Sequence, residues 1–184
     1  MMTEIMKNYA KELCEKPENI LTPHFFTEHL LIVAEYGDKL SAILNGKTEI
    51  VTIAAYLHDI SAVIDFKTLP THNEKSADIA ENILQQHNYD KSTIGQIKKC
   101  ILNHITPLGI NDGSVEDICL SNADAISQIV NPSFWLYFAF KILSLDFNDA
   151  RKWYLNKIES SWNLLIEPAK KLIEEKYVLV KRIV

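Results

Sequence analysis

The segment "AAYLHDISAV", residues 54–63, places a histidine beside an aspartate in an otherwise apolar run. On a helix, His58 shares a side with Val51, and Asp59 shares a side with Val63. Both side chains are therefore expected to lie inside the protein. A buried carboxylate costs several kcal/mol unless it is paired, hydrogen-bonded or bound to a metal. Two interpretations follow: a buried His–Asp pair satisfied by neighbouring polar groups, or two metal ligands.

Four further residues of metal-binding type occupy similar positions elsewhere in the chain. His29 has apolar residues as its helical neighbours, His72 begins a helical segment, His104 ends another, and Asp124 lies in "SNADAI". Each residue alone has an ordinary explanation, as a core histidine or a capping aspartate. Their joint placement on inward-leaning positions favours a metal site. Imidazole together with carboxylate is typical of Zn, Fe, Mn or Ni sites rather than of calcium sites.

The elements that would position these residues are helices. Apolar residues recur at helical spacing along most of the chain, and no alternating strand pattern competes with them. Thr22 and Pro23 are expected to be the N-cap and first residue of the first long helix, which should end near Asn45-Gly46. The segment 48–64 is apolar nearly all round, which predicts a buried helix. The predicted helices span residues 23–45, 48–64, 72–87, 91–105, 115–130, 133–145 and 147–180, the last one interrupted at Pro168.

Length and composition favour one compact all-α domain of about seven to eight helices. The chain has 184 residues, of which 47% are hydrophobic and 23% charged, and it carries few glycines and prolines. The ligand-bearing core is expected over residues 22–130, with C-terminal helices over 133–180 packed on it. The three cysteines follow no metal or redox spacing, which predicts reduced, buried thiols.

Charge and hydropathy exclude several classes of protein. A net charge of −5 and a pI near 5.7 indicate no excess of positive charge that could bind the phosphate backbone of a nucleic-acid polymer. The longest apolar run, "FWLYFAF" at 134–140, is too short to span a membrane, and the N-terminus lacks an apolar signal core. A cytoplasmic protein without membrane or nucleic-acid partners is therefore expected.

The order of these motifs resembles that of the HD-type metal-dependent phosphohydrolases, from about residue 26 to 130. The segment "HLLIVAEYGDKL" is similar to the opening helix of the family with its first histidine, and "TIAAYLHDIS" resembles the His–Asp signature. The segments "HNEKSADIAENIL", "IKKCILNH" and "SNADAI" resemble the three motifs that follow. The resemblance implies a helical bundle of the HD type.

The resemblance also implies a ligand set for a divalent transition metal such as Mn, Fe, Zn, Ni or Co. One ion would be held by four residues, namely His29, His58, Asp59 and Asp124. In family members with two ions, the aspartate of the signature bridges them, and the positions matching His72 and His104 hold the second. In relatives with one ion these two histidines contact substrate phosphate instead. One ion is expected, and the sequence leaves a second open.

The activity implied by the resemblance is hydrolysis of a phosphate ester or anhydride of a small molecule by metal-bound hydroxide. Nucleotides are the commonest substrates of the family. Asp65 is a candidate for proton transfer, although it could equally cap the turn "DFKTLP". Candidates for phosphate contact are Lys67, Lys75 and one of Lys98 or Lys99, all of which are also typical of solvated surface. Loops 65–71 and 106–114 are expected to form walls of the substrate pocket.

Departures from the family pattern argue against particular subfamilies. Ser61 replaces the usual glycine, Ala62 stands where some two-metal members carry lysine, and Asn122 replaces a common aspartate. No "GYP" motif follows His104, as it does in hydrolases of cyclic dinucleotides. Two alternatives remain open: a di-iron oxygenase of the HD type, and a non-catalytic sensor module with a structural metal. The chain could also form a homo-oligomer.

Overall fold

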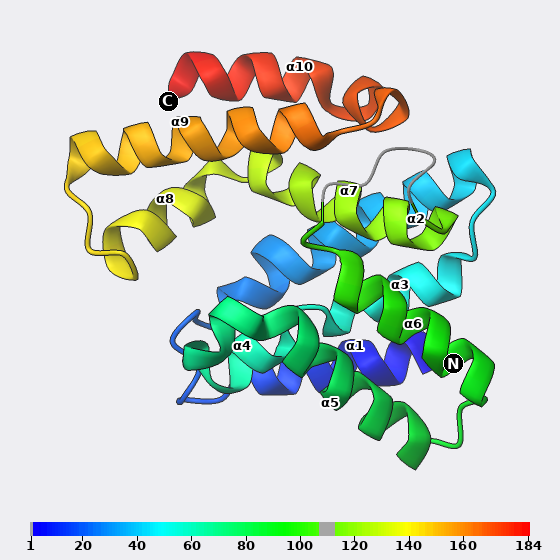
Figure 1. The fold of residues 1–184 in the computed structure, drawn as a ribbon. Coiled ribbons are helices and arrows are strands. Elements are labelled where there is room, and N and C mark those ends of the chain that lie inside the picture. The colour runs from blue at the N-terminus through cyan, green and yellow to red at the C-terminus, as the bar shows by residue number, and fades with distance from the viewer. Residues whose placement is uncertain (1, 107–112) are drawn as a thin grey trace.

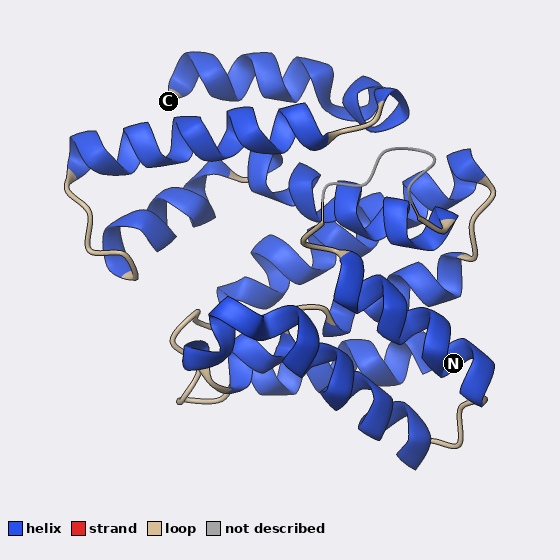
Figure 2. Ribbon diagram, viewed as in Figure 1, coloured by secondary structure: helices blue, strands red, loops and turns tan. Residues whose placement is uncertain are grey.

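The computed structural model describes residues 2–106 and 113–184, and over these residues it contains helices and no strands (Figure 2). The α-helices are α1 Met2–Cys14, α2 Leu31–Leu44, α3 Thr48–Leu57, α4 Ile60–Ile64, α5 His72–Gln86, α6 Lys91–Asn103, α7 Val115–Val130, α8 Pro132–Lys141, α9 Phe147–Leu164 and α10 Glu167–Ile183. A π-helical turn, η1, spans Phe26–Leu30, and a 3-10 helix, η2, spans Phe66–Thr71. The all-α prediction is confirmed. The described residues form more helices than the seven to eight expected, because α1 is additional and some predicted helices are divided.

The prediction of one continuous helix over residues 48–64 is wrong, because the segment forms two helices. Helix α3 ends at Leu57 and α4 begins at Ile60, because Asp59 leaves helical geometry with φ −111° and ψ 10°. The ring of His58 bonds back to Ala55 O at 2.8 Å, in the last turn of α3. Adjacent residues of a continuous helix point about 100° apart. The break instead lets both members of the His–Asp pair face one centre, with His58 Nε2 only 3.3 Å from Asp59 Oδ2.

The predicted N-cap of the first long helix is wrong, although helical geometry begins at His24, one residue after the predicted start. Thr22 adopts a left-handed backbone with φ 68°, and its hydroxyl makes no hydrogen bond within the described chain, so it does not cap the helix. The π-helical turn η1 then precedes α2. The other end agrees with prediction, since α2 stops at Asn45 in the left-handed conformation typical of a helix C-terminus. Extra residues in π turns are frequent at functional sites, and η1 carries His29.

The long C-terminal helix divides near Pro168, as expected. Leu165 and Ile166 have extended backbone, so α9 ends at Leu164 and α10 begins at Glu167 with the proline in its first turn. The two helices lie side by side and antiparallel (Figure 1). Tyr154 of α9 donates a hydrogen bond to the carbonyl of Gln128, at 3.1 Å. This bond fixes α9 against α7.

Helix α7 lies at the centre of the arrangement. It contacts α2, α3 and α6 on one side and α9 and α10 on the other, and it is buried nearly all round (Figure 1). Gly37 permits the closest approach of α2, α3 and α7. A Cβ at that position would lie 2.8 Å from Val51 Cγ1 and 3.8 Å from Ala123 Cβ. The helices that carry the predicted ligands are thus packed tightly against one another.

One continuous hydrophobic core runs from Met6 in α1 to Val184 after α10. The C-terminal helices contribute to this core, and polar contacts also attach them. Asn122 of α7 accepts a hydrogen bond from the backbone N–H of Ile166 at 2.9 Å, just before α10 begins. The three cysteines are buried and unpaired with each other, as expected. None of the helices described has the length and apolar character needed to cross a membrane.

Candidate metal centre

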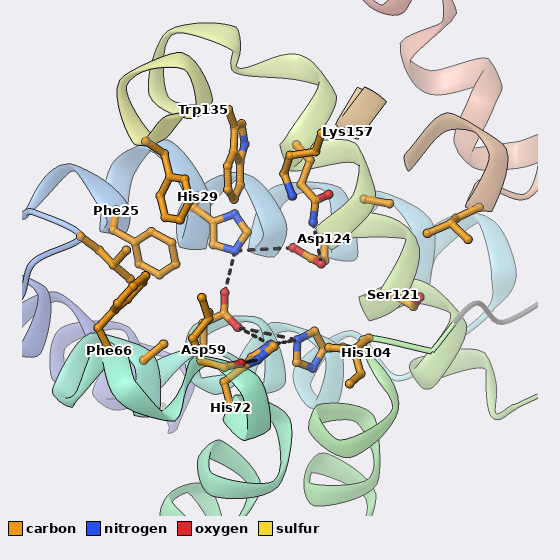
Figure 3. A pocket seen from close by; sticks show the side chains of 18 of the residues that line it. Phe25, His29, Asp59, Phe66, His72, His104, Ser121, Asp124, Trp135 and Lys157 are labelled. Atoms are coloured by element: carbon orange, nitrogen blue, oxygen red, sulfur yellow. Dashed lines mark hydrogen bonds and ion pairs between the residues drawn. The ribbon is translucent and has the colours of Figure 1, made fainter. Parts of the chain in front are cut away.

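The first group of potential metal ligands contains His29, His58, Asp59 and Asp124 (Figure 3). Asp59 Oδ2 lies 3.2 Å from His29 Nε2 and 3.3 Å from His58 Nε2, and these two ring nitrogens are 3.1 Å apart. Asp124 Oδ1 lies 3.5 Å from His29 Nε2 and 3.8 Å from His58 Nε2. The four residues come from η1, the turn between α3 and α4, and α7. The structure therefore brings together the four residues that the sequence resemblance assigned to one metal.

The second group shares Asp59 with the first. Its other carboxylate oxygen, Oδ1, lies 3.2 Å from His72 Nε2 and 3.6 Å from His104 Nε2. These two ring nitrogens are 3.0 Å apart. His72 is the first residue of α5, and His104 follows the last residue of α6. Asp59 thus presents one oxygen to each group, and its carboxylate joins the two groups.

Hydrogen bonds at the opposite ring nitrogen fix the tautomer of each histidine. Nδ1 of His58, His72 and His104 lies 2.6–2.8 Å from the carbonyl oxygen three residues earlier. A carbonyl only accepts, so each Nδ1 carries the proton and each Nε2 of a neutral ring has a lone pair. His29 Nδ1 lies 2.9 Å from the hydroxyl of Ser127, whose own proton goes to Asp124 O. All four Nε2 lone pairs therefore point at Asp59.

Such a cluster of lone pairs and carboxylates requires positive charge between its members. Within the described chain, Asp59 Oδ1 has no hydrogen-bond donor although it is enclosed. Without a metal, protons must supply the charge. Burial alone would lower the pKa of His58, but the Asp59 carboxylate beside it outweighs burial and raises that pKa to about 9. Burial opposes the ionised form of Asp59, yet the charge on His58 and the neighbouring imidazole rings hold its pKa well below the usual range. A divalent cation would be coordinated directly by the carboxylate oxygens and the Nε2 lone pairs, so the residues fit a metal.

Two helix ends add to this electrostatic preference. His58 and His104 each follow the last residue of a helix, α3 and α6 respectively. The C-terminal end of a helix carries partial negative charge from unpaired carbonyl groups, which favours a nearby cation. Their rings bind Ala55 O and Ile101 O, which lie in those last turns. The same contact thus orients the ligand and satisfies a carbonyl of the helix end.

All the residues of the two ligand groups except the fully buried His58 line a pocket of about 480 Å³, a size typical of small-molecule sites. The opposite walls are largely aromatic and aliphatic (Figure 3). Phe66 and Leu69 of η2 and Thr106 line it, in agreement with the expectation for the segment 65–71. Residues 107–112 of the second predicted loop lie outside the described residues, and Gly113 and Ser114 are not part of the described lining. The pocket also contains Lys157 of α9, which sequence reasoning did not single out.

Other predicted site residues lie elsewhere. The carboxylate of Asp65 is exposed and accepts a hydrogen bond from Lys67 N at 3.0 Å. Asp65 therefore caps η2, which is the second of the two roles considered for it from sequence. Lys67 and Lys75 are exposed and do not belong to the described lining of the pocket. Lys98 pairs with Asp78 and Glu81 of α5, and Lys99 pairs with Asp117 of α7. The structure therefore brings none of these five residues to the ligand groups.

Several polar residues hold the ligands in place and were missed or given no role from sequence. Ser61, the departure from the family glycine, donates to His72 O at 3.1 Å and accepts from the Ser76 hydroxyl at 3.1 Å. This connects the turn after the His–Asp pair to the start of α5. Gln128 donates to Asp124 Oδ2 at 3.1 Å and accepts from Ser161 of α9 at 2.8 Å. One helical turn separates Asp124 from Gln128, but no sequence signal identifies the partner on α9.

Comparison with known proteins places the chain in a family. The HD domain matches residues 26–129, more than half of the sequence, and the chain belongs to the HD-domain family. Crystal structures of Bacillus subtilis YpgQ, one of them in complex with ADP, are similar over the whole fold. The ADP complex aligns with a TM-score of 0.72 at 19% identity, covering 98% of this chain and 93% of YpgQ.

A solved structure of another protein, a predicted HD superfamily hydrolase from an uncultured Thermotogales bacterium, aligns with a TM-score of 0.59. It is 22% identical, and the alignment covers 94% of this chain and 91% of that protein. No curated protein sequence matches the chain. At these identities the similarity establishes the shared fold, which includes α8–α10 beyond the matched HD domain.

Proposed function

We propose that this protein is a metal-dependent phosphohydrolase that acts on a phosphate ester or anhydride of a small molecule, in particular a nucleotide. The observation that carries the proposal is Asp59, which offers one oxygen to each of two histidine pairs at the wall of an open pocket. A purely structural metal site is closed, whereas a catalytic site leaves room for water and substrate. The pocket beside these ligands provides that room.

We further propose that both groups hold an ion. His29, His58 and Asp124 would hold the first and His72 and His104 the second, with Asp59 shared between them. When bound, such ions would supply Lewis-acid activation of water and neutralisation of charge on phosphoryl oxygens. The protein's part is to fix the ligands. The Nδ1 hydrogen bonds orient the four rings, and Gln128 holds Asp124 through its second oxygen.

The shape and lining of the pocket support a nucleotide as the substrate. Beside the ligands, its lining includes Phe25, Phe66, Trp135, Phe138 and Trp153, which offer flat apolar surface to a base. The ADP complex of YpgQ, a protein of the same fold, also supports this choice. With a substrate bound, the aromatic walls would displace water around it and so strengthen electrostatic contacts with phosphate.

The test is hydrolysis by protein loaded with Mn²⁺, Fe²⁺, Co²⁺, Ni²⁺ or Zn²⁺. Nucleoside mono-, di- and triphosphates and a simple aryl phosphate would be supplied, and released phosphate and pyrophosphate measured. We expect turnover with at least one metal and none for Asp59→Asn. Absence of hydrolysis with every metal and substrate would refute the proposal. A mixed-valent iron spectrum with oxygen consumption would instead favour the oxygenase alternative.

A further inference from the structure

Lys157 of α9 lies in the pocket, on the side of Asp124 and Trp135 (Figure 3). Among the lining residues that the structure describes, it is the sole lysine or arginine. Its position is outside residues 26–129, the part matched by the HD domain. The family resemblance therefore assigns it no role, and any role must be argued from its surroundings.

Aromatic rings hold the ammonium group in place. Lys157 Nζ lies 4.4 Å from the ring centroid of Trp135 and 5.6 Å from that of Trp153, both within the range of cation–π attraction. Trp135 is itself fixed, because its indole N–H donates to Ser127 O at 3.2 Å and its ring meets His29 edge to face. The ammonium is thus positioned by the same residues that position the first ligand group.

The surroundings of Lys157 leave its hydrogen-bonding capacity open. An ammonium group has three donors, and ring faces accept none of them as a normal hydrogen bond. Within the described part of the chain, no carboxylate lies within ion-pair distance of Nζ and no hydrogen bond from it is formed. Burial lowers the pKa of Lys157, while the more distant Asp124 and Asp59 oppose that effect. A cation in an enclosed site without a partner is suited to an incoming anion.

We propose that Lys157 binds an anionic phosphate oxygen of the substrate, on the side of the pocket away from His72 and His104. This assignment rests on the phosphohydrolase function proposed above. The phosphate would be held between the ligand groups and the ammonium, with the rest of the substrate against the aromatic walls. Lys157 is accordingly a substrate-binding residue, and its loss should weaken binding much more than turnover at saturation.

The experiment compares Lys157→Met, Lys157→Arg and the matched control Lys152→Met with the metal-loaded wild type. Lys152 lies on the same helix, is exposed and does not line the pocket. For Lys157→Met we expect KM for the hydrolysed substrate to rise about 10- to 100-fold with kcat changed less than about threefold. Lys157→Arg should recover most of the loss, because it restores the cation, and Lys152→Met should behave as wild type.

Binding of inorganic phosphate, measured by calorimetry, separates this proposal from the proposed function. If the wild type hydrolyses none of the substrates, the proposed phosphohydrolase function is refuted. Even then, the metal-loaded wild type should bind phosphate about 10-fold or more tightly than Lys157→Met does. Metal content and Tm of Lys157→Met should not fall, since methionine fills the same space without a buried charge. Equal KM and equal phosphate affinity would overturn the proposal. A lowered Tm or lost metal would overturn it too, by showing that Lys157 is structural.

Discussion

Replacing Asp59 with asparagine tests the shared centre most directly. The side chain keeps its size, but the carboxylate that contacts four ring nitrogens at 3.2–3.6 Å becomes neutral. Loss of a partner that only supports a metal ligand typically weakens metal binding about 10- to 100-fold, and a ligand itself contributes at least as much. Each ion should therefore bind at least about 10- to 100-fold more weakly, or roughly 1.4–2.7 kcal/mol per ion.

The matched variants make the prediction specific. Asp124 contacts the rings of the first group alone, and His72 belongs to the second group alone. After incubation with Mn²⁺ and desalting, elemental analysis should find two ions per wild-type chain and about one for Asp124→Asn and for His72→Gln. Asp59→Asn should retain almost none. Circular dichroism would check that each variant keeps its helices. An Asp59→Asn protein that retains both ions would refute the shared-ligand geometry.

Two further predictions concern packing and protonation. Gly37→Ala should destabilise the protein by about 1–2 kcal/mol, because the close contact of the new Cβ with Val51 outweighs the gain in helix propensity. Gly95→Ala should instead stabilise the protein by about 0.5–1 kcal/mol, because the space around its new Cβ is open. Urea unfolding measures both, and equal stability of the two variants would contradict the close packing. Because the pKa of His58 is raised to about 9 without metal, its ring is protonated below that pH and a metal must displace the proton. Calorimetry at pH 8 in buffers of different ionisation enthalpy should show about one proton released, with affinity falling about tenfold per pH unit below 9. Binding without proton release would contradict the raised pKa.

The ligand residues could be predicted from sequence because each combines a metal-binding side chain with an apolar neighbourhood. His58 and Asp59 are conspicuous in this way, and the order of the remaining motifs supplied their partners. Helix periodicity also located the elements, including the end at Asn45 and the interruption near Pro168. Local patterns of this kind persist in the fold because burial of the apolar face determines which side of each helix turns inward.

The features that sequence could not predict depend on contacts between distant segments. Apolar periodicity continues across residues 58 and 59, so nothing in it indicates the break that turns both side chains to one centre. Lys157 has the same spacing from Trp153 as many surface lysines have from aromatic residues one turn earlier. Only the packing of α9 on α7 shows that it enters the pocket. Conversely, Lys67 and Lys75 are close to the signature in sequence but extend from the outer surface.

The hydrogen bond from each histidine ring to the carbonyl three residues earlier has a consequence for assembly. In His58, His72 and His104 this contact lies within a single short segment, so each ring is oriented by a carbonyl of its own segment. These side chains are therefore held in place without a metal, and the entropy of ordering them is not a cost of metal binding. His29 differs, because Ser127, 98 residues later, orients its ring. The two histidines of the second ligand group are thus oriented within their own segments, whereas the first group combines the locally oriented His58 with His29, whose orientation requires α7 to be in place.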